Sequence, residues 1–124
     1  MTTVRLTPTK SHRDIILHRL SCADCISEVF ADTDGLEHLA EPAYSECVEL
    51  GNQLWMKNYL EIDPNSELHR EIIKEVIEGN TWIATVTSFN FPNSPAEVGA
   101  RRALNNVAKY LTKETGIEFD YIPE

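Results

Sequence analysis

Apolar residues recur at the spacing of an α-helix through four segments of the chain, and this pattern limits its fold more than any other feature. The segments cover residues 11–30, 42–59, 64–78 and 95–115. Each predicted helix carries one apolar stripe, and such a stripe must be buried against another layer of structure. A chain of 124 residues has the size of one ordinary domain. We therefore expect residues 1–124 to fold as a single domain in which the helices share one core.

Three further segments have the alternation or composition of β-strands. They cover residues 2–7, 81–91 and 117–121. Residues 81–91 are rich in Thr, Val, Ile, Trp and Phe and carry apolar side chains on both faces, which indicates a strand that is packed on both sides. We predict an α+β fold, with a helical N-terminal half packed on a small sheet of about three strands, in the order β-α-α-α-β-α-β.

The predicted helix ends rest on capping residues. Ser11 and Asp14 form a capping box for the first helix, and Ser94 with Glu97 forms another for the last helix. Asp63 followed by Pro64 is expected to open the third helix, because proline is favoured in a first turn.

One long stretch of the sequence contains many Asp and Glu residues and no Lys or Arg. No Lys or Arg occurs between Arg19 and Lys57, and the formal net charge of the chain is −9. A surface of this kind repels nucleic acid phosphates and anionic membranes and attracts basic proteins over a distance. We therefore expect a basic protein surface as the partner, with no direct binding of nucleic acid or membrane.

The compartment follows from the cysteines and the apolar runs. No segment approaches the roughly 20 apolar residues of a membrane span, and residues 1–10 lack the apolar core of a secretory signal. The cysteines Cys22, Cys25 and Cys47 are odd in number, which fits a reducing compartment better than a secreted, disulfide-linked domain. We expect a cytoplasmic protein.

The leading hypothesis is a non-enzymatic interaction protein. Its carboxylates would occupy sites that a basic surface offers to phosphates, such as the nucleic-acid-binding surface of a defence or regulatory complex, and would inhibit it. The candidate contact residues surround the loop before the second predicted helix and continue along that helix: Asp32, Asp34, Glu37, Glu41, Glu46 and Glu49. No complete catalytic or phosphate-loop signature occurs in the sequence, so we expect neither enzymatic activity nor a cofactor.

A metal site is an alternative reading of the first helix. His18, Cys22 and Cys25 are spaced i, i+4 and i+7, which would place an imidazole and two thiols on one helical face. Cys47 or His38 would supply a fourth ligand. The same positions continue the apolar stripe, and a buried cysteine commonly serves as a small apolar residue. A redox pair of Cys22 and Cys25 is a further alternative, although the prediction places both in the middle of a helix, away from the N-terminus that stabilises a thiolate.

A second hypothesis is a binding site for a nucleotide-like anion at residues 89–102. Phe89 would stack on a base, Asn90 and Asn93 lie in the loop, and Arg101 and Arg102 would pair with phosphate near a helix N-terminus. The alternative is that the capping box already satisfies the amide groups at this helix start.

The segment from Trp82 to Leu111 resembles small phage-encoded proteins of the ABA-sandwich type. The resemblance rests on Trp-Ile-Ala, a loop with proline, and the Ala-Arg-Arg-Ala-Leu run that begins at Ala100. It implies a phage or mobile-element origin and carries over neither a fold nor site residues.

Two expectations concern other side chains. His12, His38 and His69 stand in polar surroundings, which predicts solvated rather than catalytic imidazoles. Apolar residues crowd the end of the second predicted helix at Trp55, Met56, Tyr59 and Leu60, and a homodimer would cover them.

Overall fold

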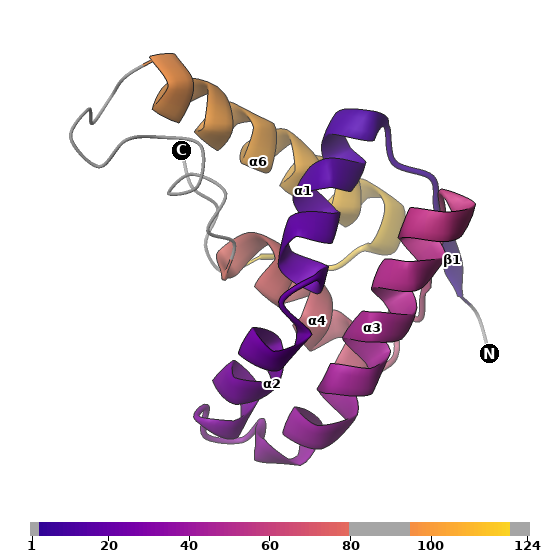
Figure 1. The fold of residues 1–124 in the computed structure, drawn as a ribbon, viewed down its shortest axis with the longest axis vertical. Helices are drawn as coiled ribbons and strands as arrows, with labels where there is room; N and C mark the ends of the chain where they lie inside the picture. Colours follow the sequence, from indigo (N-terminus) through magenta and orange to yellow (C-terminus); the bar gives the residue numbers. More distant parts are fainter. Residues whose placement is uncertain (1–2, 80–94, 120–124) are drawn as a thin grey trace.

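The computed structural model describes residues 3–79 and 95–119, and helices make up most of them (Figure 1). In chain order the elements are β1 (Val4–Leu6), α1 (Lys10–Leu20), α2 (Ala23–Ala31), the 3-10 helix η1 (Glu37–Leu39), α3 (Ala40–Lys57), β2 (Leu60–Ile62), α4 (Glu67–Glu78) and α6 (Pro95–Thr115). The class is α+β, as the apolar pattern predicts.

The sheet is smaller than the sequence predicts. Within the described residues it consists of β1 and β2 only, paired antiparallel with Val4 opposite Ile62 and Leu6 opposite Leu60. The prediction of three strands in the order β-α-α-α-β-α-β is therefore wrong in detail, because residues 117–119 form no strand and β2 was not expected. The strand predicted at 81–91 lies outside the described residues.

The segment predicted as one helix over residues 11–30 is two helices. Ser21 ends α1, and Cys22, with φ −99° and ψ 52°, is the N-cap of α2. The Ser21 hydroxyl donates to the His18 carbonyl at 2.9 Å, and such a local bond competes with helix continuation. The break lets α1 and α2 follow one another along the same side of α3 (Figure 1).

Other helix ends differ by a few residues. Helix α1 begins after Thr9 without a side-chain cap, so the predicted capping box of Ser11 and Asp14 does not form. Helix α4 begins at Glu67 rather than at Pro64, because Asp63 accepts the Asn65 amide at 2.9 Å in a turn and Ser66 becomes the N-cap. Helix α3 ends at Lys57, because its C-cap Asn58 has a φ of 61°, the left-handed conformation that terminates helices.

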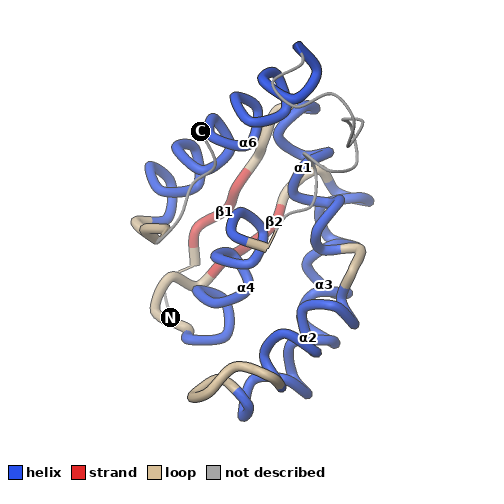
Figure 2. The backbone as a smooth tube through the Cα atoms, turned by 90° about the vertical axis from the view of Figure 1, so that its left-hand side faces the viewer, coloured by secondary structure: helices blue, strands red, loops and turns tan. Residues whose placement is uncertain are grey.

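A single hydrophobic core joins these elements. Strand β2 packs on α3 and β1 packs on α6, so the two strands lie between these helices (Figure 2). The largest fully buried side chains come from both strands and from helices α1, α2, α3 and α4: Phe30, Leu6, Ile15, Ile16, Leu20, Ile26, Leu54, Leu60, Ile62, Ile72, Ile73 and Ile77. Each buried side chain of this size contributes about 1.5–3 kcal/mol, so the stripes predicted from periodicity hold the fold together.

Candidate functional site

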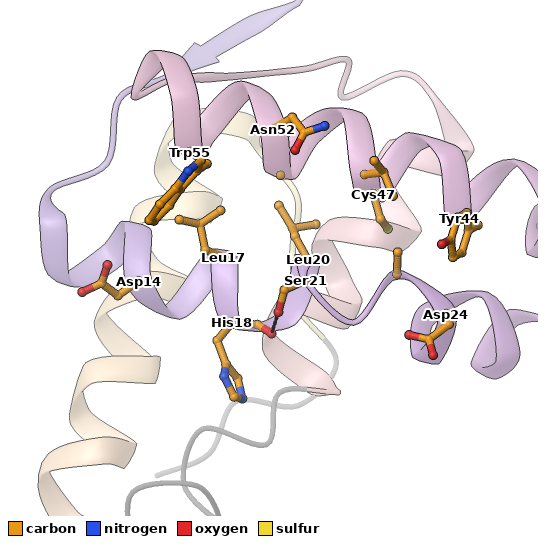
Figure 3. A pocket seen from close by; sticks show the side chains of 13 residues that line it. Asp14, Leu17, His18, Leu20, Ser21, Asp24, Tyr44, Cys47, Asn52 and Trp55 are labelled. Atoms are coloured by element: carbon orange, nitrogen blue, oxygen red, sulfur yellow. Dashed lines mark hydrogen bonds between the residues drawn. The ribbon is translucent and has the colours of Figure 1, made fainter.

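Helices α1 and α3 border a groove of about 580 Å³, and the start of α2 lies at one end of it (Figure 3). The lining residues come from all three helices: Asp14, Leu17, His18, Leu20, Ser21, Ala23, Asp24, Tyr44, Cys47, Val48, Gly51, Asn52 and Trp55. Figure 3 shows Trp55 beside Leu17 at one end and Tyr44 at the other, while His18 points away from α3.

The outer edge of the groove is an exposed apolar row on α3, which we call the α3 row and define as Tyr44, Val48 and Trp55. Spacings of four and seven residues place these side chains on one face of the helix. Their exposed fractions are 52% for Tyr44, 42% for Val48 and 70% for Trp55. Neighbouring Met56 is 76% exposed but does not line the groove. Large amphipathic aromatics are the side chains that dominate protein interfaces when they become buried.

Gly51 lies where α3 passes close to α1. A Cβ atom at this position would lie 3.8 Å from the Leu20 Cβ, which is ordinary van der Waals contact. The backbone of α3 therefore borders the groove at its middle without a side chain to fill the space. Leu20 and Cys47, which are buried, form the floor.

Carboxylates stand at both ends of the groove. Asp14 lies below Trp55, and Asp24 lies near Tyr44 (Figure 3). Asp14 pairs with Lys10 at 3.2 Å, an exposed pair one helical turn apart. Glu41 is exposed and lies seven residues before Val48, so it continues the α3 row toward the start of the helix. Among the described residues that line the groove, none is Lys or Arg.

Five of the six predicted contact carboxylates are exposed: Asp32, Asp34, Glu37, Glu41 and Glu49. They lie on the loop after α2, on η1 and on α3. Within residues 3–79 and 95–119 none of the five forms an ion pair, although Glu37 accepts the Gly35 amide at 2.8 Å. Their charges therefore face solvent without compensation.

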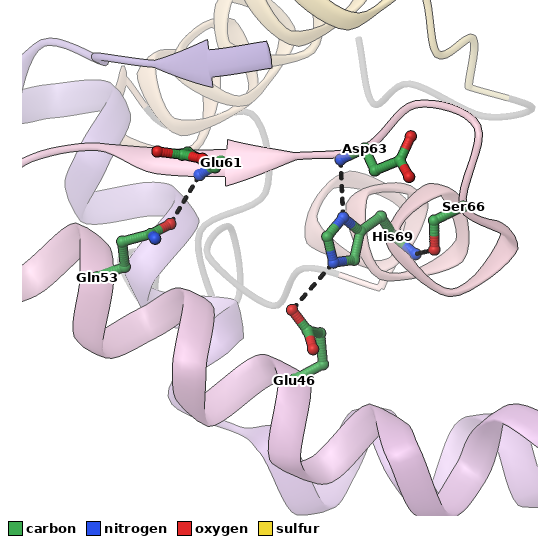
Figure 4. Close-up of polar contacts among 6 residues, drawn as sticks. All are labelled: Glu46, Gln53, Glu61, Asp63, Ser66 and His69. Atoms are coloured by element: carbon green, nitrogen blue, oxygen red, sulfur yellow. Dashed lines mark hydrogen bonds and ion pairs between the residues drawn. The ribbon is translucent and has the colours of Figure 1, made fainter. Parts of the chain in front are cut away.

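Glu46, the sixth predicted contact residue, is half-buried rather than exposed. Its Oε1 lies 3.0 Å from His69 Nε2, and His69 is only 15% exposed at its side chain (Figure 4). The Asp63 amide donates to His69 Nδ1 at 2.8 Å, so Nδ1 carries no hydrogen and Nε2–H donates to Glu46. The contact ties α4 to α3, so Glu46 has a structural role.

The prediction of solvated histidines is also wrong for His69, because both of its ring nitrogens form hydrogen bonds within the protein. His38 is exposed as predicted, and its Nε2 lies 2.6 Å from Glu67 Oε1. His12 is half-buried against Tyr110, with ring centroids 5.4 Å apart.

The proposed metal ligands do not share a helical face. His18 belongs to α1, Cys22 caps α2, and Cys25 lies in the first turn of α2, because of the break at Ser21. No cluster of three or more His, Cys, Asp or Glu side chains suited to a metal ion occurs in the part of the chain that the structure describes. Cys47 is fully buried, and burial raises the pKa of its thiol to about 12.

The break also corrects the placement of the cysteine pair. Cys22 and Cys25 stand at the N-terminus of α2, not in the middle of a helix. Both are half-buried free thiols. Burial, followed by the neighbouring Cys22 and Asp24, raises the pKa of Cys25, which opposes formation of a thiolate there.

The alternative anion site is only partly described. Phe89, Asn90 and Asn93 lie outside the described residues. Arg101 is half-buried and Arg102 is exposed on α6, where both line a hollow of about 310 Å³ with Lys109.

The groove itself was not predicted. The sequence places Tyr44, Val48 and Trp55 beside the stripe of Ala43, Cys47, Leu50 and Leu54, and only the latter four are buried. The signal was the width of the stripe, since α3 carries more apolar rows than one packed layer covers.

No family model matches the chain, and neither the curated proteins nor the solved structures contain a match. In the described residues, no helix combines the length and apolar character needed to cross a bilayer.

Proposed function

We propose that this protein is a non-enzymatic binding module that docks its acidic N-terminal half on a basic surface of another protein. The observation that carries the proposal is the set of five exposed carboxylates on the loop after α2, η1 and α3 that form no ion pair within the described residues. A surface with one sign of charge costs stability through self-repulsion, and a basic partner relieves that repulsion.

The charge pattern also favours rapid and selective encounter. Uncompensated carboxylates on the loop after α2, on η1 and on α3 would steer a basic partner into contact and repel acidic ones. Carboxylates present two oxygens each, which suits the guanidinium groups that basic surfaces use for phosphates. The proposed partner is therefore a nucleic-acid-binding surface, such as that of a defence or regulatory complex, which this protein would inhibit by occupying it.

Affinity purification of the full chain from its host, followed by native mass spectrometry, supplies the partner for a direct test. The purified partner is then titrated with the wild type and with an Asp34→Lys/Glu49→Lys variant. Neither residue lies at a helix terminus, so the substitutions do not change a charge that interacts with a helix dipole. We expect the variant to bind at least about tenfold more weakly, because two attractive contacts become repulsive.

The matched control is Glu114→Lys/Glu118→Lys. Both residues are exposed near the C-terminal end of the described chain, and the two variants change the net charge equally. Equal affinity of both variants would show that total charge, and not the proposed acidic surface, governs binding and would overturn the proposal.

A further inference from the structure

We infer that the groove between α1 and α3 receives a single amphipathic α-helix of the partner, with basic residues beside its apolar stripe. The inference rests on the proposed function and identifies the element of the partner that is recognised. It depends on the shape of the groove, on the α3 row and on the charges around them.

The apolar side chains fit a helix better than a small ligand. Tyr44 and Trp55 are eleven residues apart on α3, a distance of about 16 Å along the helix axis. A helix laid along this row would place apolar residues at i, i+4 and i+11 against Tyr44, Val48 and Trp55, which have the same spacing. A small molecule within the groove would leave the outer face of Trp55, which is 70% exposed, in water.

The absence of a side chain at Gly51 permits close approach at the middle of the row. The two apolar ends, Tyr44 and Trp55, rise on either side of this position along α3. A side chain of the docked helix can therefore enter between them and reach the buried floor at Leu20 and Cys47.

Charge selects the occupant. Asp14, Asp24 and Glu41 surround the α3 row, and no described residue that lines the groove is Lys or Arg. A second copy of this chain would bring the same carboxylates and the same net charge of −9 against the groove. A helix with Lys or Arg at its polar edges would instead meet Asp24 and Glu41 near Tyr44, which favours a basic partner over a homodimer. At the Trp55 end it would meet Asp14, which already pairs with Lys10.

The test uses three synthetic helical peptides of about five turns, titrated into the full chain by calorimetry. One has a Leu stripe flanked by Lys, one has the same stripe flanked by Glu, and one has the Lys composition in scrambled order. We expect the Lys peptide to bind at least about tenfold more tightly than either of the others. Equal binding of the Lys and Glu peptides would overturn the electrostatic part of the inference, and equal binding of the scrambled peptide would overturn the helical part.

A matched pair of variants locates the contact. Trp55→Ala is expected to weaken binding of the Lys peptide at least about tenfold, whereas Met56→Ala changes it less than about twofold, because Met56 is equally exposed but lies outside the groove. Indistinguishable losses in the two variants would contradict docking in the groove.

The same variants separate this inference from the proposed function. If the host partner loses affinity for Asp34→Lys/Glu49→Lys but binds Trp55→Ala normally, the acidic surface docks without the groove and the inference fails alone. Light scattering measures the molar mass of the wild type and of Trp55→Ala. If the wild type is a dimer and Trp55→Ala is a monomer, the groove binds a second copy of this chain and the inference is overturned.

Discussion

At the residue scale, a buried ion pair makes Gly79 sensitive to substitution. Arg19 Nη2 lies 2.9 Å from Glu75 Oε2, and the Arg19 side chain is only 8% exposed. A Cβ atom at Gly79 would overlap the Glu75 carboxylate and lie 2.9 Å from Arg19 Nη2. Displacing the carboxylate would leave the Arg19 guanidinium buried without its partner, which is costly.

We therefore predict that Gly79→Ala lowers the free energy of unfolding by about 1–3 kcal/mol in urea titrations. Gly51→Ala is the control, because its Cβ would make only ordinary contact with Leu20 and alanine favours the helix. That variant should gain about 0.5–1 kcal/mol. Stabilisation of both variants would show that helix propensity, rather than the ion pair, decides the outcome at Gly79.

Cys47 is expected to make the folded protein less stable as the pH becomes alkaline. Burial raises the pKa of its thiol from 9.0 to about 12, so the unfolded chain loses the proton first as pH rises. The free energy of unfolding should fall between pH 9 and about 12, by up to about 1.4 kcal/mol per pH unit from this group. Chemical denaturation at several pH values checks this, and Cys47→Ala should show a shallower decline. Parallel curves for the two proteins would assign the decline to other groups.

At the scale of elements, His69 connects three of them. It accepts the Asp63 amide after β2, donates to Glu46 of α3, and belongs to the first turn of α4, whose N-cap Ser66 accepts the His69 amide at 3.2 Å (Figure 4). A second contact, from the Glu61 amide to Gln53 Oε1 at 2.7 Å, joins β2 to α3.

His69→Phe should lower the free energy of unfolding by about 2 kcal/mol, because it leaves the Asp63 amide and the Glu46 carboxylate without this partner. His69→Asn places an amide oxygen where Nδ1 accepts, so it should recover about half of that loss in the same denaturation experiment. Equal destabilisation by Phe and Asn would argue that the size of the imidazole matters more than its hydrogen bonds.

The sequence predicts the elements unevenly. The start of α6 at Pro95 and its end at Thr115 agree with prediction, because Gly116, with φ +76°, terminates the helix as expected. The break between α1 and α2 was missed, since apolar spacing continues through Ser21 and only a hydroxyl-to-carbonyl bond marks the change. Strand β2 has three residues, too few for an alternating pattern to stand out.

The candidate site was also only partly predictable from the sequence. The exposed carboxylates at Asp32, Asp34 and Glu41 were predictable because charged side chains on a loop and an outer helix face remain in water. The groove was not, because periodicity gives the width of an apolar stripe but not which row α1 and α2 cover. The bond between Glu46 and His69 depends on the packing of α4 against α3, and no local pattern reveals it.

At the scale of the whole molecule, charge and shape converge on one half of the chain. The uncompensated carboxylates and the groove both belong to residues 14–55, which contain a single residue with a permanent positive charge, Arg19, and Arg19 is buried with Glu75. The other Lys and Arg residues lie before residue 14 or after residue 55. The molecule therefore presents an acidic, partly apolar surface on one half.

The measurement that tests the central claim most directly is the association rate constant with the co-purified basic partner, followed from low to physiological salt. We predict a rate that falls steeply as salt increases, that drops at low salt in Asp34→Lys/Glu49→Lys, and that is nearly unchanged in Glu114→Lys/Glu118→Lys. A rate that is independent of salt and equal in all three proteins would contradict docking through the acidic surface.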